Sequence, residues 1–108
     1  LKEIALQSGV DIELTETAIP VRDNVGGACA ILGLDPLFVA NEGKLLAIVA
    51  PEAAEEILAA MKTAPTGKEA AVIGTVIESG SGRLSLETAI GGKRSVEMLA
   101  GEQLPRIC

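Results

Sequence analysis

Histidine, tryptophan and tyrosine are absent from this sequence of 108 residues, and Phe38 is its single aromatic residue. Without histidine the chain can form neither a Ser-His-Asp triad nor a histidine-ligated metal site. One aromatic residue and a net charge of −6 leave no stacking platform or basic groove for nucleic acid. No apolar run approaches the roughly 18 residues of a membrane span. We therefore expect no metal, no nucleic acid and no membrane among its partners.

Cysteine is scarce as well, with Cys29 and Cys108 as the two thiols and no CxxC motif. Two thiols without histidine cannot complete a four-ligand zinc site. A disulfide between them is disfavoured, because Cys29 falls within a predicted helix and acts there as a small apolar residue. The N-terminus has neither a methionine nor a signal-peptide pattern. We expect a fragment or excised domain of a cytoplasmic protein.

Aliphatic residues dominate what is present, and a chain of this length buries roughly two thirds of its unfolded surface around one core. Apolar spacing predicts three helices, at 1–8, at 22–32 and from Pro51 to a stop at Pro65 and Gly67. Alternation and β-branched residues predict strands at 10–15, 44–50, 70–78 and 83–87, with a last strand or short helix at 93–98. The turn at 79–82 is predicted to join 70–78 and 83–87 as a hairpin.

This order predicts an α+β domain over residues 1–100, with a mixed sheet and helices packed mainly on one face. A flexible tail, residues 101–108, is expected to follow and to end in Cys108. Eight extended residues reach roughly 25 Å, so a thiol on this arm can enter more than one active site. The thiolate is a strong nucleophile. From the residues alone, a reactive thiol and an incidental terminal cysteine are equally good interpretations.

Three segments resemble a known family: Leu34–Val49 (LDPLFVANEGKLLAIV), Thr88–Arg94 (TAIGGKR) and the C-terminal GEQLPRIC. With them the chain resembles the carbamoyl dehydratase (HypE) family of hydrogenase maturation proteins. The C-terminal domain of that family belongs to the aminoimidazole ribonucleotide (AIR) synthetase superfamily, so the resemblance implies the same α+β fold. It covers essentially all 108 residues and leaves out an N-terminal half that contains the ATP-binding domain.

The resemblance implies that Cys108 accepts a carbamoyl group from a carbamoyltransferase, HypF. ATP then phosphorylates the carbamoyl oxygen, and loss of phosphate and a proton leaves a thiocyanate. The cyano group passes to iron on a HypC–HypD scaffold and becomes a cyanide ligand of nickel–iron hydrogenase. The intact protein is expected to use ATP and magnesium and to form a homodimer.

The carbamoyl nitrogen must lose protons, which requires a general base within hydrogen-bond reach. Glu42, in the ANEG turn, corresponds to the plausible base of the family, although by itself it reads as an exposed turn residue. Asn41 and Gly43 are expected to shape this turn. The resemblance further implies that three tail residues present the thiol and dock it on partners: Pro105, Arg106 and Ile107.

No glycine cluster of this sequence fits a phosphate-binding loop. Gly26 and Gly27 fall inside a predicted helix, and Gly91-Gly92-Lys93 lacks the flanking residues of a P-loop. We expect this fragment to bind no cofactor and to catalyse no dehydration by itself. Whether the fragment is a monomer is left open.

Two other interpretations stay open. The chain could belong to another ATP-dependent enzyme of the superfamily, although those chemistries need no C-terminal thiol. It could also be a non-catalytic scaffolding domain with an incidental Cys108.

Overall fold

The computed structural model describes residues 1–78 and 80–98. They divide into two compact units. The first, which we call the sheet unit, contains Leu1–Pro20 and Ile48–Glu97. The second, the α2 unit, contains Val21–Ala47 and Met98. The predicted tail, 101–108, lies outside the described residues, so the boundary expected at residue 100 stays a prediction.

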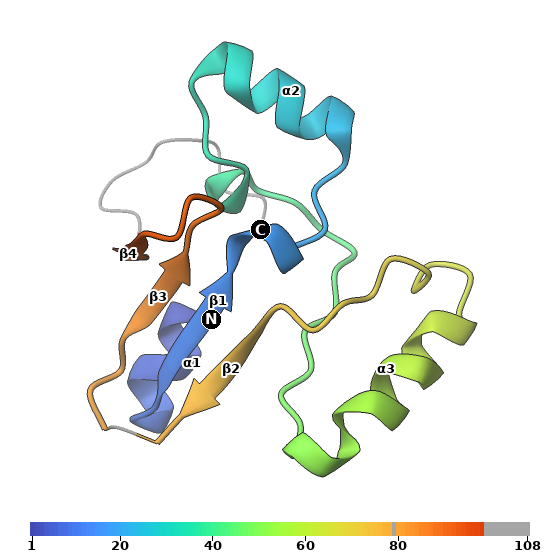
Figure 1. Cartoon of the computed structure of the whole chain (residues 1–108), viewed down its shortest axis with the longest axis vertical. Coiled ribbons are helices and arrows are strands. Elements are labelled where there is room, and N and C mark those ends of the chain that lie inside the picture. The colour runs from blue at the N-terminus through green and yellow to red at the C-terminus, as the bar shows by residue number, and fades with distance from the viewer. Residues whose placement is uncertain (79, 99–108) are drawn as a thin grey trace. The chain divides into compact units, whose positions relative to one another are not determined.

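The sheet unit is built on four strands in the order β2-β1-β3-β4 (Figure 1). They are β1 (Asp11–Thr15), β2 (Gly74–Ile77), β3 (Leu84–Glu87) and β4 (Lys93–Ser95). β1 runs antiparallel to β2 and parallel to β3, and β3 runs antiparallel to β4. The sheet is therefore mixed, which confirms the predicted α+β class.

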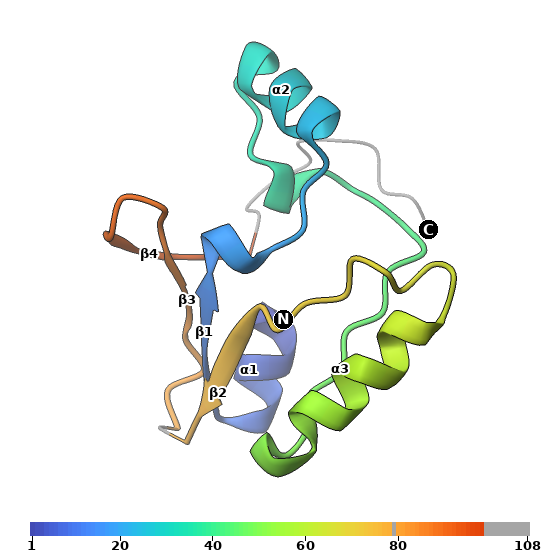
Figure 2. The ribbon, with the colours of Figure 1, turned by 45° about the vertical axis from the view of Figure 1, so that its right-hand side comes forward.

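One face of the sheet carries the apolar core. In the parallel register Ile12 lies opposite Leu84 and Leu14 opposite Leu86, and all four side chains are buried. Alternation places the polar partners of these residues on the other face. α1 (Lys2–Ser8) lies against the apolar face, where its residue Ala5 is fully buried (Figure 2). The predicted one-sided covering by this helix is confirmed.

Both flanking helices of the sheet unit end and begin where the sequence indicates. α1 stops at Gly9, whose φ of 64° is left-handed and favours glycine. α3 (Ala54–Thr63) follows a 3₁₀ turn over Pro51–Ala53, so the proline stands at the entrance as expected. Glutamates in its first turn and Lys62 in its last turn complement the helix dipole.

The α2 unit consists of α2 (Asp23–Leu32) and a 3₁₀ turn over Pro36–Phe38. Gly33 caps α2 with a φ of 67°, and the Leu34 amide donates to the Cys29 carbonyl at 2.9 Å. Among the described helices none is long and apolar enough to cross a membrane.

The predicted hairpin between 70–78 and 83–87 is wrong. β2 and β3 do not pair with each other, because β1 lies between them. A turn sequence such as that at 79–82 is equally compatible with a connection that passes over the end of an intervening strand. The strand that lies between β2 and β3 is selected by the burial of Ile12 and Leu14. This burial depends on contacts between distant segments, which the local spacing of residues does not predict.

The strand predicted at 44–50 is also wrong. The structure leaves this segment outside the four-stranded sheet, with Leu45 75% exposed. An apolar run forms a strand only where a neighbouring strand satisfies its backbone groups, and among the described residues no strand pairs with it. Of the two alternatives left open for 93–98, the strand is the one observed, because Lys93–Ser95 pairs antiparallel with β3 after the Gly91-Gly92 turn.

Candidate functional site

Glu42 lies in a turn over residues 41–43, which follows the Pro36–Phe38 turn of the α2 unit. Asp35 opens this segment, and its carboxylate accepts the Leu37 amide at 2.9 Å. The Asn41 side-chain amide donates to the Val39 carbonyl at 3.1 Å, which turns the chain before Glu42. Gly43 has a φ of 73°, in the left-handed region where a residue with a Cβ is strained.

Glu42 itself is exposed, and its carboxylate makes no hydrogen bond or ion pair within residues 1–78 and 80–98. Both oxygens can therefore accept a proton from a group brought to the turn. Nothing in the described geometry assigns this chemistry, so the catalytic role of Glu42 stays a prediction.

The other residues of the predicted site lie outside the described residues. This holds for the thiol of Cys108 and for the three residues that precede it: Pro105, Arg106 and Ile107. Among the predicted site residues that the structure describes, Asn41 and Gly43 lie in the same turn as Glu42. The described part of the chain contains no group of three carboxylates or thiols arranged to hold a metal ion.

Cys29 has the structural role that the sequence indicates. It lies on α2, 5% exposed, with a free thiol. A buried thiol is a poor nucleophile, so Cys29 is not a candidate for the reactive thiol.

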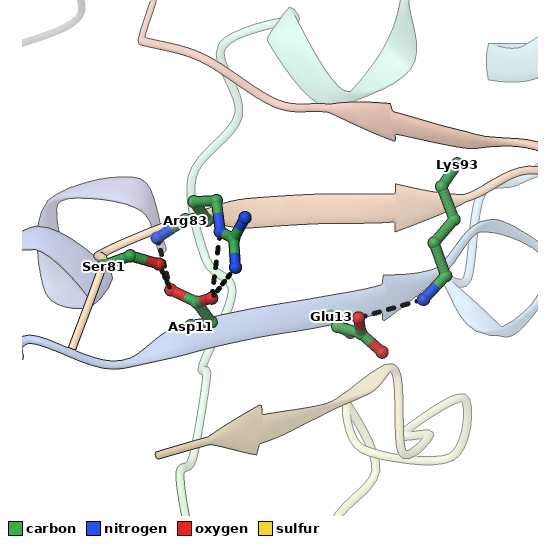
Figure 3. Close-up of polar contacts among 5 residues, drawn as sticks. All are labelled: Asp11, Glu13, Ser81, Arg83 and Lys93. Atoms are coloured by element: carbon green, nitrogen blue, oxygen red, sulfur yellow. Dashed lines mark hydrogen bonds and ion pairs between the residues drawn. The ribbon is translucent and has the colours of Figure 1, made fainter. Parts of the chain in front are cut away.

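The sheet unit contains a polar cluster that the sequence analysis missed, consisting of Asp11, Ser81 and Arg83 (Figure 3). Asp11 is only 7% exposed. One of its carboxylate oxygens accepts from the Ser81 hydroxyl at 2.7 Å and from the Arg83 amide at 2.8 Å. The other accepts from the Arg83 guanidinium, with both Nε and Nη2 at 3.1 Å.

This cluster ties the start of β1 to the segment that enters β3, more than seventy residues later. Each buried carboxylate oxygen has a donor, so the cost of removing the charge from water is offset. In the sequence, Asp11 looks like an ordinary polar position of an alternating strand. No local signal distinguishes it, because its partners come from a distant turn.

Exposed carboxylates make further links at the other end of the strands. Glu13 on β1 pairs with Lys93 on β4 at 3.0 Å, across β3 (Figure 3). The Glu16 carboxylate accepts the Ala89 amide at 2.7 Å in the β3–β4 turn. Exposed pairs of this kind contribute little to stability.

Comparison with known proteins defines the family. The model of the family described as AIR synthase related protein, C-terminal domain, matches residues 1–87. The chain therefore belongs to this family, as its α+β fold and its sequence motifs indicated.

Its relatives are more specific than the family model. The chain is 57% identical to the carbamoyl dehydratase HypE of Azotobacter vinelandii over 108 residues, which is 100% of this chain and 32% of that protein. A crystal structure of hydrogenase maturation protein HypE in complex with ATP matches with a TM-score of 0.91 and 49% identity, over 100% of this chain and 33% of that one.

A crystal structure of a HypE–HypF complex also matches, with a TM-score of 0.83 and 39% identity, over 90% of this chain and 31% of that one. The chain thus spans about a third of the length of the curated relatives it matches. The family model ends at residue 87, whereas the match to the carbamoyl dehydratase continues to residue 108.

Proposed function

We propose that this chain is the thiol-bearing C-terminal part of a carbamoyl dehydratase that acts in hydrogenase maturation. The observation that carries the proposal is the 57% identity with a carbamoyl dehydratase over all 108 residues. The identity extends beyond residue 87, where the model of the wider family stops. It therefore favours the carbamoyl dehydratases over other enzymes of the superfamily.

In this proposal the Cys108 sulfur attacks the carbonyl carbon of a carbamoyl donor and forms an S–C bond, and the thiol proton is lost to solvent. The bond between that carbon and the donor's leaving group breaks, and the leaving group departs with the electron pair. The γ-phosphoryl group of ATP is transferred to the carbamoyl oxygen, ADP departs, and the nitrogen loses one of its two protons as the C=N bond forms. Phosphorylation makes that oxygen a good leaving group. Departure of phosphate and removal of the remaining N–H proton convert the carbon to a thiocyanate. No oxidant or reductant is needed, because the carbon keeps its oxidation state throughout.

Glu42 is the residue we assign as the base that removes protons from the carbamoyl nitrogen. Its turn is fixed on both sides, by the Asn41 hydrogen bond and by the left-handed Gly43. Its side chain is exposed. The carboxylate makes no hydrogen bond or ion pair with any described residue, so it can accept a proton. A fixed backbone with an open carboxylate suits a base that must meet a group delivered on another segment.

ATP, magnesium and the partner proteins are assigned to the longer polypeptide. Binding of ATP by the longer protein is supported by the HypE–ATP complex, and a carbamoyltransferase partner by the HypE–HypF complex. Within this chain, Gly26 and Gly27 lie inside α2 and Gly91-Gly92 form the β3–β4 turn. None of these glycines leads into the start of a helix, so we expect the phosphates to be bound elsewhere. Delivery of the cyano group to a HypC–HypD iron scaffold and a homodimeric state remain part of the same proposal.

The two thiols provide a matched test in the longer protein. After incubation with the carbamoyltransferase, its carbamoyl donor and ATP, mass spectrometry should locate the added group on the peptide that contains Cys108. Cys108→Ala should abolish loading, whereas Cys29→Ala should leave it unchanged. Loading on Cys29 would overturn the assignment. A purely scaffolding protein would still support hydrogenase maturation after deletion of residues 105–108.

The role of Glu42 is tested by separating loading from dehydration. Glu42→Gln keeps the size of the side chain and removes its basicity, so loading of Cys108 should persist while thiocyanate formation slows at least tenfold. Glu52→Gln, on the turn that precedes α3, is a matched control with no expected effect. An unchanged dehydration rate in Glu42→Gln would remove Glu42 from the mechanism.

A further inference from the structure

The turn between β3 and β4 presents an isoleucine to water. Ile90 lies at the tip of this turn and is 95% exposed, the highest value among the large apolar side chains that the structure describes. Such turn positions are more commonly occupied by glycine, asparagine or aspartate. In Figure 2 the turn projects from the sheet on the side away from α1. Ile90 therefore contributes nothing to the core of the sheet unit.

Hydrogen bonds hold this turn in one conformation. The Thr88 amide donates to the Gly92 carbonyl at 2.7 Å, and the Thr88 hydroxyl bonds to the backbone of the same residue. From outside the hairpin, the Glu16 carboxylate accepts the Ala89 amide at 2.7 Å. The backbone on both sides of Ile90 is thus fixed before anything binds to it. Binding through this side chain loses little backbone freedom, which favours affinity.

The turn also lies close to the root of the Cys108 arm. Val96, directly after β4, is 8% exposed, and its amide donates to the Leu84 carbonyl at 2.8 Å. Ile90 precedes Val96 by six residues, which is at most roughly 20 Å along the chain. Residues 97–108 follow, and twelve extended residues reach roughly 40 Å. A protein bound to the turn is therefore within reach of the Cys108 thiol.

The turn and the arm share a second property, their place relative to the wider family. The family model ends at residue 87, just before the turn, whereas the match to a carbamoyl dehydratase continues through the turn and the arm to residue 108. A contact common to all enzymes of the superfamily is expected within the part that the model covers. The position of the turn instead favours a partner that is particular to the carbamoyl dehydratases.

We propose that Ile90 and its turn dock the carbamoyltransferase that loads Cys108, and that the isoleucine enters an apolar pocket of that enzyme. This inference rests on the proposed function. An unloaded thiol offers little surface for recognition, so the enzyme that loads it needs a second, rigid contact. The iron scaffold needs such a contact less, because the cyano group itself binds the metal. Docking at the turn raises the effective concentration of the thiol at the carbamoyl donor.

Calorimetric titration of the longer protein with the carbamoyltransferase measures this contact. Ile90→Asp places a charge in the apolar pocket and should raise the Kd at least about tenfold, since burial of one aliphatic side chain contributes roughly that factor or more. Ile90→Leu keeps an apolar side chain of equal size and should stay within about threefold of the wild type. Ile31→Asp on α2, where the side chain is 87% exposed, is a matched control with no expected change.

The kinetics of carbamoyl loading provide a readout that a purely structural role would not move. Ile90 contacts none of the reacting atoms in this proposal. Ile90→Asp should therefore raise the KM for the longer protein at least about tenfold and leave the kcat of carbamoyl transfer unchanged, because it removes binding that is equal in the ground and transition states.

The outcomes separate this inference from the proposed function. Unchanged Kd and KM in Ile90→Asp, with normal loading of the wild type, would overturn the docking site and leave the proposed function intact. A wild type that is not loaded at all would overturn both.

Two further results would assign the turn to another occupant and overturn the proposal. A lower melting temperature of Ile90→Asp at unchanged Kd would indicate a contact within the longer polypeptide. A smaller sedimenting mass at unchanged Kd would indicate a contact between two copies.

Discussion

The sheet unit and the α2 unit hold their conformations in different ways. All buried apolar residues of the described chain except Cys29 belong to the sheet unit. Large apolar side chains are exposed in both units, such as Ile90 at 95% in the sheet unit and Ile31 at 87% in the α2 unit. The α2 unit differs in having Cys29 as its one buried apolar residue among those described. Its conformation is specified by local signals, such as the Gly33 cap and the Asp35 turn. A core stabilises the first unit, and backbone preferences shape the second.

The largest expected effect comes from the centre of the sheet unit. Leu86 is fully buried, so Leu86→Ala should lower the free energy of unfolding by about 2–5 kcal/mol. Ile31→Ala on α2 should change it by less than about 0.5 kcal/mol, because the side chain is already in water. Urea unfolding of both variants measures the difference. Equal losses would mean that the two units do not differ in this way.

Glycine-to-alanine substitutions should change the stability in opposite directions in the two units. A Cβ at Gly74 would lie 2.2 Å from the Glu13 carbonyl oxygen, so β2 would have to move away from β1. We expect Gly74→Ala to destabilise the chain by about 1–3 kcal/mol. At Gly27, inside α2, a Cβ meets no described atom within 4 Å, and Gly27→Ala should stabilise by about 0.5–1 kcal/mol. Thermal unfolding of the pair tests this, and a loss at Gly27 would indicate an additional close neighbour of α2.

Loss of the buried carboxylate of β1 should reduce the stability more than loss of an exposed one. Asp11→Asn removes the charge that binds Arg83 and leaves a nearly isosteric amide, with an expected loss of about 1–3 kcal/mol. Glu13→Gln removes the exposed pair with Lys93 and should cost less than about 1 kcal/mol. Chemical denaturation of both variants, in low and high salt, provides the measurement. A larger loss at Glu13 would contradict the burial argument.

The smallest effect is a pH dependence at the end of the sheet. The Ser95 hydroxyl donates to the Glu97 carboxylate, and Lys2 lies 3.2 Å from it. The Ser95 hydrogen bond is the largest single cause that lowers the pKa of Glu97 below its usual 4.5, and the hydrogen bond and charge of Lys2 lower it further. A folded-state pKa below the unfolded one means that the unfolded state binds more protons. The stabilisation is therefore present above pH 4.5 and is lost as the pH falls through the lower, folded value.

Glu97→Gln should consequently make the loss of stability below pH 4.5 shallower. Ser95→Ala and Lys2→Met should each remove part of this effect, because the Ser95 hydrogen bond and the Lys2 contact both lower the pKa of Glu97. Unfolding midpoints measured from neutral pH into the acid range follow the change. An unaltered pH profile in Glu97→Gln would exclude this carboxylate as a contributor.

Local patterns predicted the helices and most strands correctly. Gly9 and Gly33 end helices because the left-handed cap favours glycine, a preference that acts within a single turn. The alternation of β1 and β3 identified the residues that become the core. The segment at 44–50 was predicted as a strand from the same kind of pattern and is not one, because composition reports suitability for a strand and not the presence of a neighbour.

The polar sites also include one that the sequence indicated and one that it did not. Glu42 was singled out by resemblance, and the turn around it follows from Asn41 and Gly43, both readable in the sequence. The cluster of Asp11, Ser81 and Arg83 was missed, because its members are separated by about seventy positions and none of them is unusual by itself.

The sequence by itself determined the absence of histidine chemistry, the positions of the helices, and the identity of the residues able to form a core. Those properties depend on side-chain type and on neighbours within a few positions. Only the tertiary structure decided that β1 separates β2 from β3, that Asp11 is buried with an arginine, and that the turn between β3 and β4 leaves Ile90 in water. Each of these depends on which distant segments exclude water together, and that is a property of the folded chain as a whole.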